Sequence, residues 1–273
     1  MKSALSRGVN VFMFARAAPF YARYTIRHHM PAELLLGSFA GVIQLCDLVS
    51  RKTLNAPDWV IAWQASVPMM TFVLAMVWRD LLEDRDRKKT LIFTGLFGKG
   101  IFLLAAFVVL PTQLLTIVIA WALVDSAFIP LKNTIFRANY DDRVRGRFFG
   151  GVVSLTNLTL VIANLGAAYL LTRWEWTYRI LLPAAAVAGI AAHVIYSRVR
   201  VRGEDRGPAR ERSGGGLRTL YQPFVRGFTT TIRILKEDRD FRAYEVNFFI
   251  YGMAFLMNLP LVVFLIVDEI ELP

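Results

Sequence analysis

Cysteine and histidine are both scarce in this chain of 273 residues, which contains one Cys and three His. The single thiol, Cys46, excludes an internal disulfide, and one Cys offers no ligand spacing for a metal ion. No arrangement of Ser, His and Asp is typical of a nucleophilic site, and Gly98-Lys99-Gly100 lacks the spacing of a phosphate-binding loop. These absences argue against an enzyme. We expect no catalytic residue, no cofactor and no metal.

Acidic residues are also in short supply. The 21 Asp and Glu are outnumbered by 32 Lys and Arg, and the formal net charge is +11. In a soluble protein this excess would suggest a nucleic-acid partner. Here 55% of the residues are hydrophobic, the mean hydropathy is +0.44, and the basic residues lie between long apolar blocks. A lipid bilayer is therefore the expected partner, and nucleic acid is not.

Seven apolar blocks are long enough to cross a hydrocarbon core of roughly 30 Å, which takes about 20 residues as a helix. The first block is the least apolar, because it contains Gln44 and Asp47 and runs into Arg51 and Lys52. The sequence therefore predicts an all-α fold, a polytopic helical bundle in the membrane. The approximate bounds of the blocks are Leu34–Leu54, Pro57–Trp78, Thr90–Leu110, Leu114–Ile135, Phe148–Thr172, Tyr178–Arg198 and Val246–Val267.

The basic residues of the connecting segments alternate strongly between the two sides of the predicted bundle. The N-terminal segment and every second connection together carry 27 Lys and Arg, and the other connections carry 4. Lys132 is counted with the basic connection between the fourth and fifth blocks. Because cytoplasmic loops are enriched in Lys and Arg, this asymmetry predicts a cytoplasmic N-terminus.

The longest connection lies between the sixth and seventh blocks. Apolar residues recur there at steps of three and four over Leu217–Arg239, which predicts an amphipathic helix on the membrane surface. The N-terminal segment is either a plain basic tail or an interfacial helix over Val9–Tyr24. The expected parts are a cytoplasmic tail over 1–32, six spans over 33–198, a cytoplasmic linker over 199–242 and the seventh span over 243–273.

The loop between the second and third blocks reads Asp80-Leu-Leu-Glu-Asp-Arg-Asp-Arg-Lys-Lys89. It resembles the signature loop of the major facilitator superfamily (MFS), Gly-x-Leu-Ala-Asp-Arg-x-Gly-Arg-Arg, which occupies the same place. Asp80 and Arg87 stand where the family has glycines, whereas five positions match: Leu82, Asp84, Arg85, Lys88 and Lys89. The resemblance implies a conformational switch formed by Asp84, Arg85, Lys88 and Lys89. The alternative is an ordinary basic loop.

The order of spans and linker is similar to that family as well, and the similarity runs from Leu34 to the end of the sequence. It implies a six-helix half built from three-plus-three inverted repeats, plus one further transmembrane helix that begins a second, missing half. The implied function is secondary active transport of a small solute by alternating access in a bacterial inner membrane, with a proton or another coupling ion. A chain of this length is then not expected to transport alone. The alternatives are a seven-helix receptor or sensor, and a membrane-embedded enzyme.

Three ionisable groups inside the apolar blocks are candidates for a substrate or coupling-ion site: Asp47, Lys99 and Asp125. A charge at the bilayer centre costs about 2.5–3.5 kcal/mol, so such a group should face a cavity or a partner. Lys99 and Asp125 lie at similar depths and are expected to pair, with a purely structural pair as the alternative. The resemblance implies that the first span lines the transport path, which favours Asp47 for coupling.

Polar and small residues complete the set of candidates. Gln44, Gln64 and Asn164 lie on spans that line the cavity in the resembling family, and hydrogen bonds between helices are the alternative. Gly37 and Gly41 are four residues apart in the first block. This spacing predicts close packing against another helix.

Overall fold

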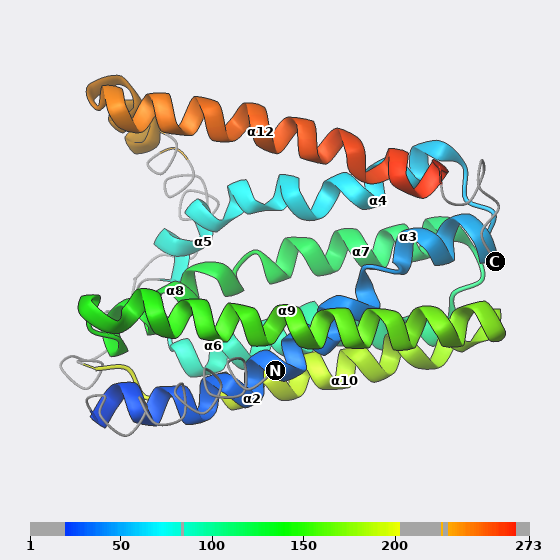
Figure 1. Ribbon diagram of the computed structural model, residues 1–273, viewed down its shortest axis with the longest axis horizontal. Coiled ribbons are helices and arrows are strands. Elements are labelled where there is room, and N and C mark those ends of the chain that lie inside the picture. The colour runs from blue at the N-terminus through cyan, green and yellow to red at the C-terminus, as the bar shows by residue number, and fades with distance from the viewer. Residues whose placement is uncertain (1–19, 83–84, 203–224, 226–228, 266–273) are drawn as a thin grey trace, which may run out of the picture.

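The computed structural model describes residues 20–82, 85–202, 225 and 229–265, and these residues form helices and connecting turns without a strand. The long helices run side by side, and α12 lies at the edge of the bundle beside α4 (Figure 1). Residues 229–237 are helical, and the rest of the predicted amphipathic helix before Val225 and over 226–228 lies outside the described residues. The α-helices are α2 (Phe20–Ile43), α3 (Cys46–Leu48), α4 (Asp58–Met70), α5 (Leu74–Leu82), α6 (Arg87–Phe93), α7 (Pro111–Asp125), α8 (Phe128–Asn139), α9 (Asp142–Arg173), α10 (Tyr178–Ser197) and α12 (Arg239–Phe264).

Shorter helical turns continue or join these elements. Two are π-helical, η1 (Val49–Thr53) and η3 (Thr94–Gly98), and three are 3₁₀-helical, η2 (Thr71–Val73), η4 (Lys99–Phe107) and η5 (Glu175–Thr177). The first predicted span is therefore built from α2, α3 and η1, and the third from α6, η3 and η4. Several of the predicted spans are thus interrupted helices rather than single regular ones.

Helix α2 covers Phe20–Ile43, so the described chain is already helical well before the expected start of the first block at Leu34. Ala22, Ile26 and His29 are buried on its inner face. One face of residues 20–32 thus packs against the bundle, within the segment that was predicted as a cytoplasmic tail. The hydropathy pattern missed this segment because its buried face alternates with arginines and other polar residues.

Helix α2 is the centre of the packing, with α9 on one side and α10 on the other. A Cβ atom added to Gly37 would lie 2.4 Å from the carbonyl oxygen of Thr156 on α9. One added to Gly41 would lie 2.3 Å from the carbonyl oxygen of Leu160. No side chain fits at such distances, so the two glycines allow the backbones of α2 and α9 to touch. The close packing predicted from their spacing is confirmed.

Long helices expose apolar side chains outward, as membrane helices do. On α9, Ile162, Leu165 and Tyr169 are 62%, 65% and 71% exposed. In water this surface would be costly, whereas lipid accepts it without penalty. Within the described residues, five helical segments are long and apolar enough to cross a membrane: Phe20–Thr53, Arg87–Phe107, Pro111–Asn139, Arg145–Arg173 and Glu175–Ser197.

These five segments correspond to the first, third, fourth, fifth and sixth predicted blocks. The second block forms α4, η2 and α5, and the seventh falls on α12. Among the described residues, neither block contains a helix that is both long enough and apolar enough to count as a candidate span. The fold is therefore a helical membrane bundle, and the count of six spans plus one stays a prediction.

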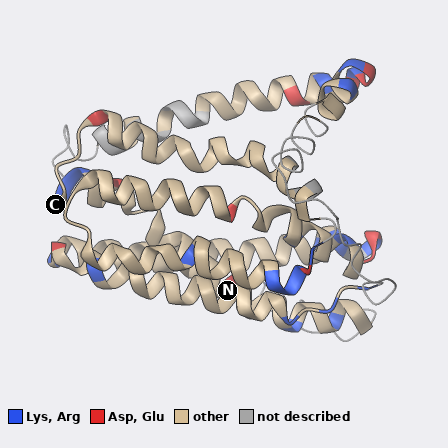
Figure 2. Ribbon diagram, turned by 180° about the vertical axis from the view of Figure 1, so that it is seen from behind, with Lys and Arg blue, Asp and Glu red and all other residues tan. Residues whose placement is uncertain are grey.

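Basic residues gather at one end of the bundle. Figure 2 shows most of the Lys and Arg at the end where α10 finishes and α12 begins, with few at the other end. This is the spatial counterpart of the alternation of charge along the sequence.

Candidate functional site

The first span is interrupted next to its candidate residues. Gln44 and Leu45 separate α2 from α3, and the N–H of Leu45 bonds the carbonyl of Val42 instead of that of Gly41. Gln44 is exposed, and Asp47 is half-buried on the short α3. Within the described part of the chain, Asp47 makes no hydrogen bond or ion pair. Interrupted helices place free backbone groups and uncompensated charges at binding sites in transporters, so this break marks a candidate site.

Asn164 satisfies the carbonyl that the break leaves free. Its side-chain Nδ2 donates a hydrogen bond of 2.9 Å to the carbonyl oxygen of Gly41 from the neighbouring α9. Gln64 on α4 is buried and accepts a 2.9 Å hydrogen bond from the hydroxyl of Ser50. Asn164 and Gln64 thus each form a hydrogen bond between two spans. Such bonds were the alternative to a role in lining a cavity. A role in solute binding stays a prediction for both.

Lys99 and Asp125 form the expected ion pair. Lys99 Nζ lies 2.9 Å from Asp125 Oδ2, and the two side chains are only 6% and 20% exposed. The ammonium group also lies 4.3 Å from the centroid of the Phe39 ring and 5.3 Å from that of Trp121. These aromatic faces partly replace the water that the charge loses on burial. Gly189 on α10 makes room for this arrangement, since a Cβ there would lie 2.9 Å from the stem of Lys99.

The signature-like loop is anchored by residues that the family pattern does not emphasise. Asp86 caps α6 by accepting hydrogen bonds from the backbone N–H groups of Lys88 and Lys89, which is the usual role of an N-terminal Asp. Arg87 donates through Nη2 to the carbonyl of Val199, 2.6 Å away, just beyond the end of α10.

The described residues of the predicted switch make fewer side-chain contacts than Asp86 and Arg87. Arg85 and Lys88 have exposed side chains, and Lys89 Nζ lies 3.9 Å from Asp86 Oδ2. Asp84 lies outside the described residues. The residue that reaches across the protein is therefore Arg87, which occupies a position where the family pattern has glycine.

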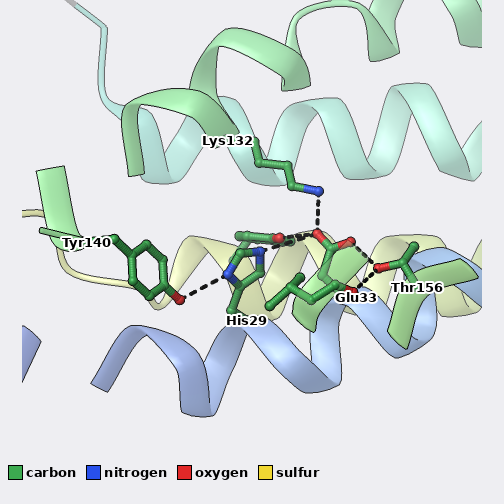
Figure 3. A network of polar contacts seen from close by, with 7 residues as sticks. His29, Glu33, Lys132, Tyr140 and Thr156 are labelled. Atoms are coloured by element: carbon green, nitrogen blue, oxygen red, sulfur yellow. Dashed lines mark hydrogen bonds and ion pairs between the residues drawn. The ribbon is translucent and has the colours of Figure 1, made fainter. Parts of the chain in front are cut away.

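A buried polar network joins four helices around Glu33 (Figure 3). Glu33 is 2% exposed and forms an ion pair with Lys132 of α8. The hydroxyl of Thr156 on α9 donates to Glu33 Oε2 at 2.7 Å, and the hydroxyl of Tyr196 on α10 donates to Oε1. His29, one turn earlier on α2, lies with Nε2 3.4 Å from Oε1. Donors from three other helices therefore hold a carboxylate that would be costly to bury alone.

Tyr140 extends the network to the end of α8. Its hydroxyl lies 3.1 Å from Nδ1 of His29, as Figure 3 shows. Burial, together with the charge of Glu33, raises the pKa of Tyr140 well above its usual value, so the hydroxyl keeps its proton and can donate. Nδ1 of His29 then accepts, and the imidazole proton belongs on Nε2, facing Glu33.

No sequence pattern predicted this network. Lys132 was counted with a basic loop, but it lies on α8 inside the candidate span Pro111–Asn139. Glu33 lies at the edge of the first block, and no role was predicted for it. The spacing of His29 and Glu33, four residues apart on one helix face, was a local signal that could have linked these two. Thr156 and Tyr196 offered no such signal, since the fold alone brings them near.

Metal ligands are not clustered in the described part of the chain, where no three His, Cys, Asp or Glu side chains could hold an ion. The candidate sites are instead isolated or paired charges inside an apolar bundle. Such groups can bind a proton or a polar solute, or fix one helix against another.

Comparison with known families accounts for nearly the whole chain. The family model described as Major Facilitator Superfamily matches residues 8–272. The chain belongs to this superfamily, and it is a membrane transporter of the major facilitator type. No curated protein and no solved structure matched the chain.

Proposed function

We propose that this protein is a secondary active transporter that moves a small solute by alternating access and couples the movement to protons through Asp47. The N-terminus and the basic end of the bundle face the cytoplasm, and the protein belongs in a bacterial inner membrane. The six-helix part forms one rocking unit built from inverted repeats, with α12 as the start of the opposing unit.

The single observation behind this proposal is the environment of Asp47. It is a half-buried carboxyl on an interrupted first span, without an ion pair or hydrogen bond in the described part of the chain. A structural carboxylate inside a membrane helix normally has a partner, as Asp125 has in Lys99. A carboxyl that lacks one is suited to take up and release a proton, because neither charge state is locked.

The test is solute-driven proton movement in everted membrane vesicles from cells that express the complete gene, because alternating access needs two opposing units and residues 1–273 are not expected to transport alone. The fluorescence quenching of a pH-sensitive dye reports the proton gradient across the vesicle membrane. Amino acids, sugars, carboxylic acids and nucleosides are added in turn. At least one solute class should change the dye signal in the wild type, and Asp47→Asn should abolish that change at equal protein level.

Asp58→Asn is the matched control, because Asp58 is a 76% exposed carboxylate that pairs with Arg51 beyond the end of the same span. This variant should behave as the wild type. Solute-driven proton movement that is the same in Asp47→Asn as in the wild type would exclude Asp47 from coupling.

A further inference from the structure

Helix α8 is a short helix that a two-residue interruption separates from α7, the other helix of its span. Ser126 and Ala127 separate it from α7, and the N–H of Ala127 bonds the carbonyl of Val124 in a tighter turn. Pro130, near the start of α8, has no N–H to offer the carbonyl of Ser126 four residues earlier. A proline at this position removes one helical hydrogen bond and favours a bend. The joint between α7 and α8 therefore has the features of a hinge.

Two polar clamps hold α8 against the bundle, in addition to the hydrogen bond between Tyr140 at its C-terminal end and His29. The first, in the middle of α8, is the ion pair between Lys132 and Glu33. The Lys132 side chain is 25% exposed, whereas that of Glu33 is 3% exposed. Glu33 also keeps its contacts with His29, Thr156 and Tyr196, which come from other helices. The carboxylate is thus held in place without Lys132, and Lys132 is the partner that can leave.

The second clamp lies at the end of α8. Asn139 Nδ2 donates to Thr25 Oγ1 and to the carbonyl of Arg200, both at 2.8 Å, and Asn139 Oδ1 accepts from the N–H of Arg202 at 2.9 Å. Arg200 and Arg202 belong to the segment that follows α10. The end of α8 is therefore tied to the start of the connection that leads towards α12.

The segment that follows α10 also accepts hydrogen bonds from side chains of other helices. The carbonyl of Arg198 accepts from the hydroxyl of Tyr24 on α2 at 2.8 Å, and the next carbonyl, of Val199, accepts from Arg87. With Asn139 on Arg200, three successive carbonyls are each bound by a side chain of a different helix. Displacement of this segment would release α8, α2 and the signature-like loop together.

We propose that α8 is a hinged segment that turns about Ser126–Ala127 during the transport cycle and is latched in the present conformation by Lys132–Glu33 and by Asn139. The inference rests on the proposed function, because it assigns the moving part of an alternating-access cycle. The ten helical steps from Ala127 to Arg137 span about 15 Å at 1.5 Å per residue. A kink change of about 20° moves Arg137 by about 5 Å.

The test measures distances between spin labels on α8 and α10 in a Cys46→Ser background. Labels at Arg137→Cys and Ala184→Cys, both exposed positions, report the position of α8. Lys132→Met removes the charge and keeps the side-chain length, and Asn139→Ala removes the second clamp. The double variant Lys132→Met/Asn139→Ala should show a second population shifted by about 5 Å, with smaller populations in the single variants. A single wild-type distance in all three would overturn the proposal.

Three controls separate a hinge from general loosening. A label pair at Leu165→Cys on α9 and Ala184→Cys on α10 should stay unchanged in every variant, and broadening there would also overturn the proposal. Asp58→Asn, at the opposite end of the bundle, should leave α8 in place. Pro130→Ala restores the missing N–H, so in the Lys132→Met background it should suppress the second population. If the double variant does not insert into the membrane, the hinge is tested by comparing the distances in Lys132→Met with those in Lys132→Met/Pro130→Ala.

These distances require no solute, so the two proposals can fail separately. An immobile α8 together with Asp47-dependent proton movement would reject the hinge alone. A mobile α8 without solute-driven proton movement would reject the proposed coupling alone.

Discussion

The contact between α2 and α9 gives the most direct stability prediction, because it depends on two glycines. In Gly37→Ala the new Cβ would lie 2.1 Å from the Thr159 hydroxyl oxygen and 2.4 Å from the carbonyl oxygen of Thr156. The hydroxyl can rotate away, but the carbonyl belongs to the backbone of α9. The helices must therefore separate by about 1 Å to reach an ordinary contact. Overpacking of this kind typically costs about 1–3 kcal/mol.

Gly41→Ala should cost a similar amount, since its Cβ would lie 2.3 Å from the carbonyl oxygen of Leu160 and 2.9 Å from the backbone nitrogen of Asn164. The separation also stretches the hydrogen bond from Asn164 to Gly41. Once one alanine has forced the helices apart, the second alanine has more room and costs less free energy of unfolding. The double variant should thus lose less stability than the sum of the two single variants.

The assay uses the one thiol of the chain. Cys46 is 2% exposed, so a thiol-reactive fluorophore labels it only as the protein unfolds. The melting temperature in detergent should fall by roughly 2–4 °C for each kcal/mol lost. Gly166→Ala on α9 is the matched control: nothing lies within 4 Å of its Cβ, and alanine favours the helix by up to about 1 kcal/mol. Melting temperatures of Gly37→Ala and Gly41→Ala equal to or above that of Gly166→Ala would refute the close contact.

The buried ion pair yields two linked predictions. Lys99→Met leaves the Asp125 carboxylate without its partner, and Asp125→Asn leaves the ammonium group buried against Phe39 and Trp121, so each should cost about 3–5 kcal/mol. The double variant Lys99→Met/Asp125→Asn should recover a large part of that loss, because no buried charge remains unpaired. The same Cys46 melting assay measures all three, and strictly additive losses would contradict the pairing.

Part of this structure follows directly from local features of the sequence. Helices that cross lipid need long apolar runs, and the runs over the third to sixth blocks correspond to candidate spans. The spacing of Gly37 and Gly41 indicated a close helix contact, and the similar depth of Lys99 and Asp125 indicated a pair. In these cases the prediction needs only the residue spacing within one helix, or the similar depth of two residues in the membrane.

The rest depends on tertiary structure. The network around Glu33 unites residues from positions 29 to 196, and no local pattern states that Lys132, Thr156 and Tyr196 converge on one carboxylate. The helical part of α2 before Leu34 was missed because burial against α8 and α9 stabilises a segment rich in Arg and His. The break at Ser126 has a local cause in the sequence, because Pro130 has no N–H to bond the carbonyl of Ser126.

The proposed transport cycle depends most of all on which end of the bundle faces the cytoplasm, and one labelling experiment measures this orientation. In a Cys46→Ser background, Arg85→Cys and Arg173→Cys place single exposed thiols at the two ends. With a membrane-impermeant maleimide on intact cells, Arg173→Cys should be labelled, and Arg85→Cys should be labelled only after the membrane is opened. Labelling of Arg85→Cys in intact cells would contradict the orientation and, with it, the proposed transport cycle.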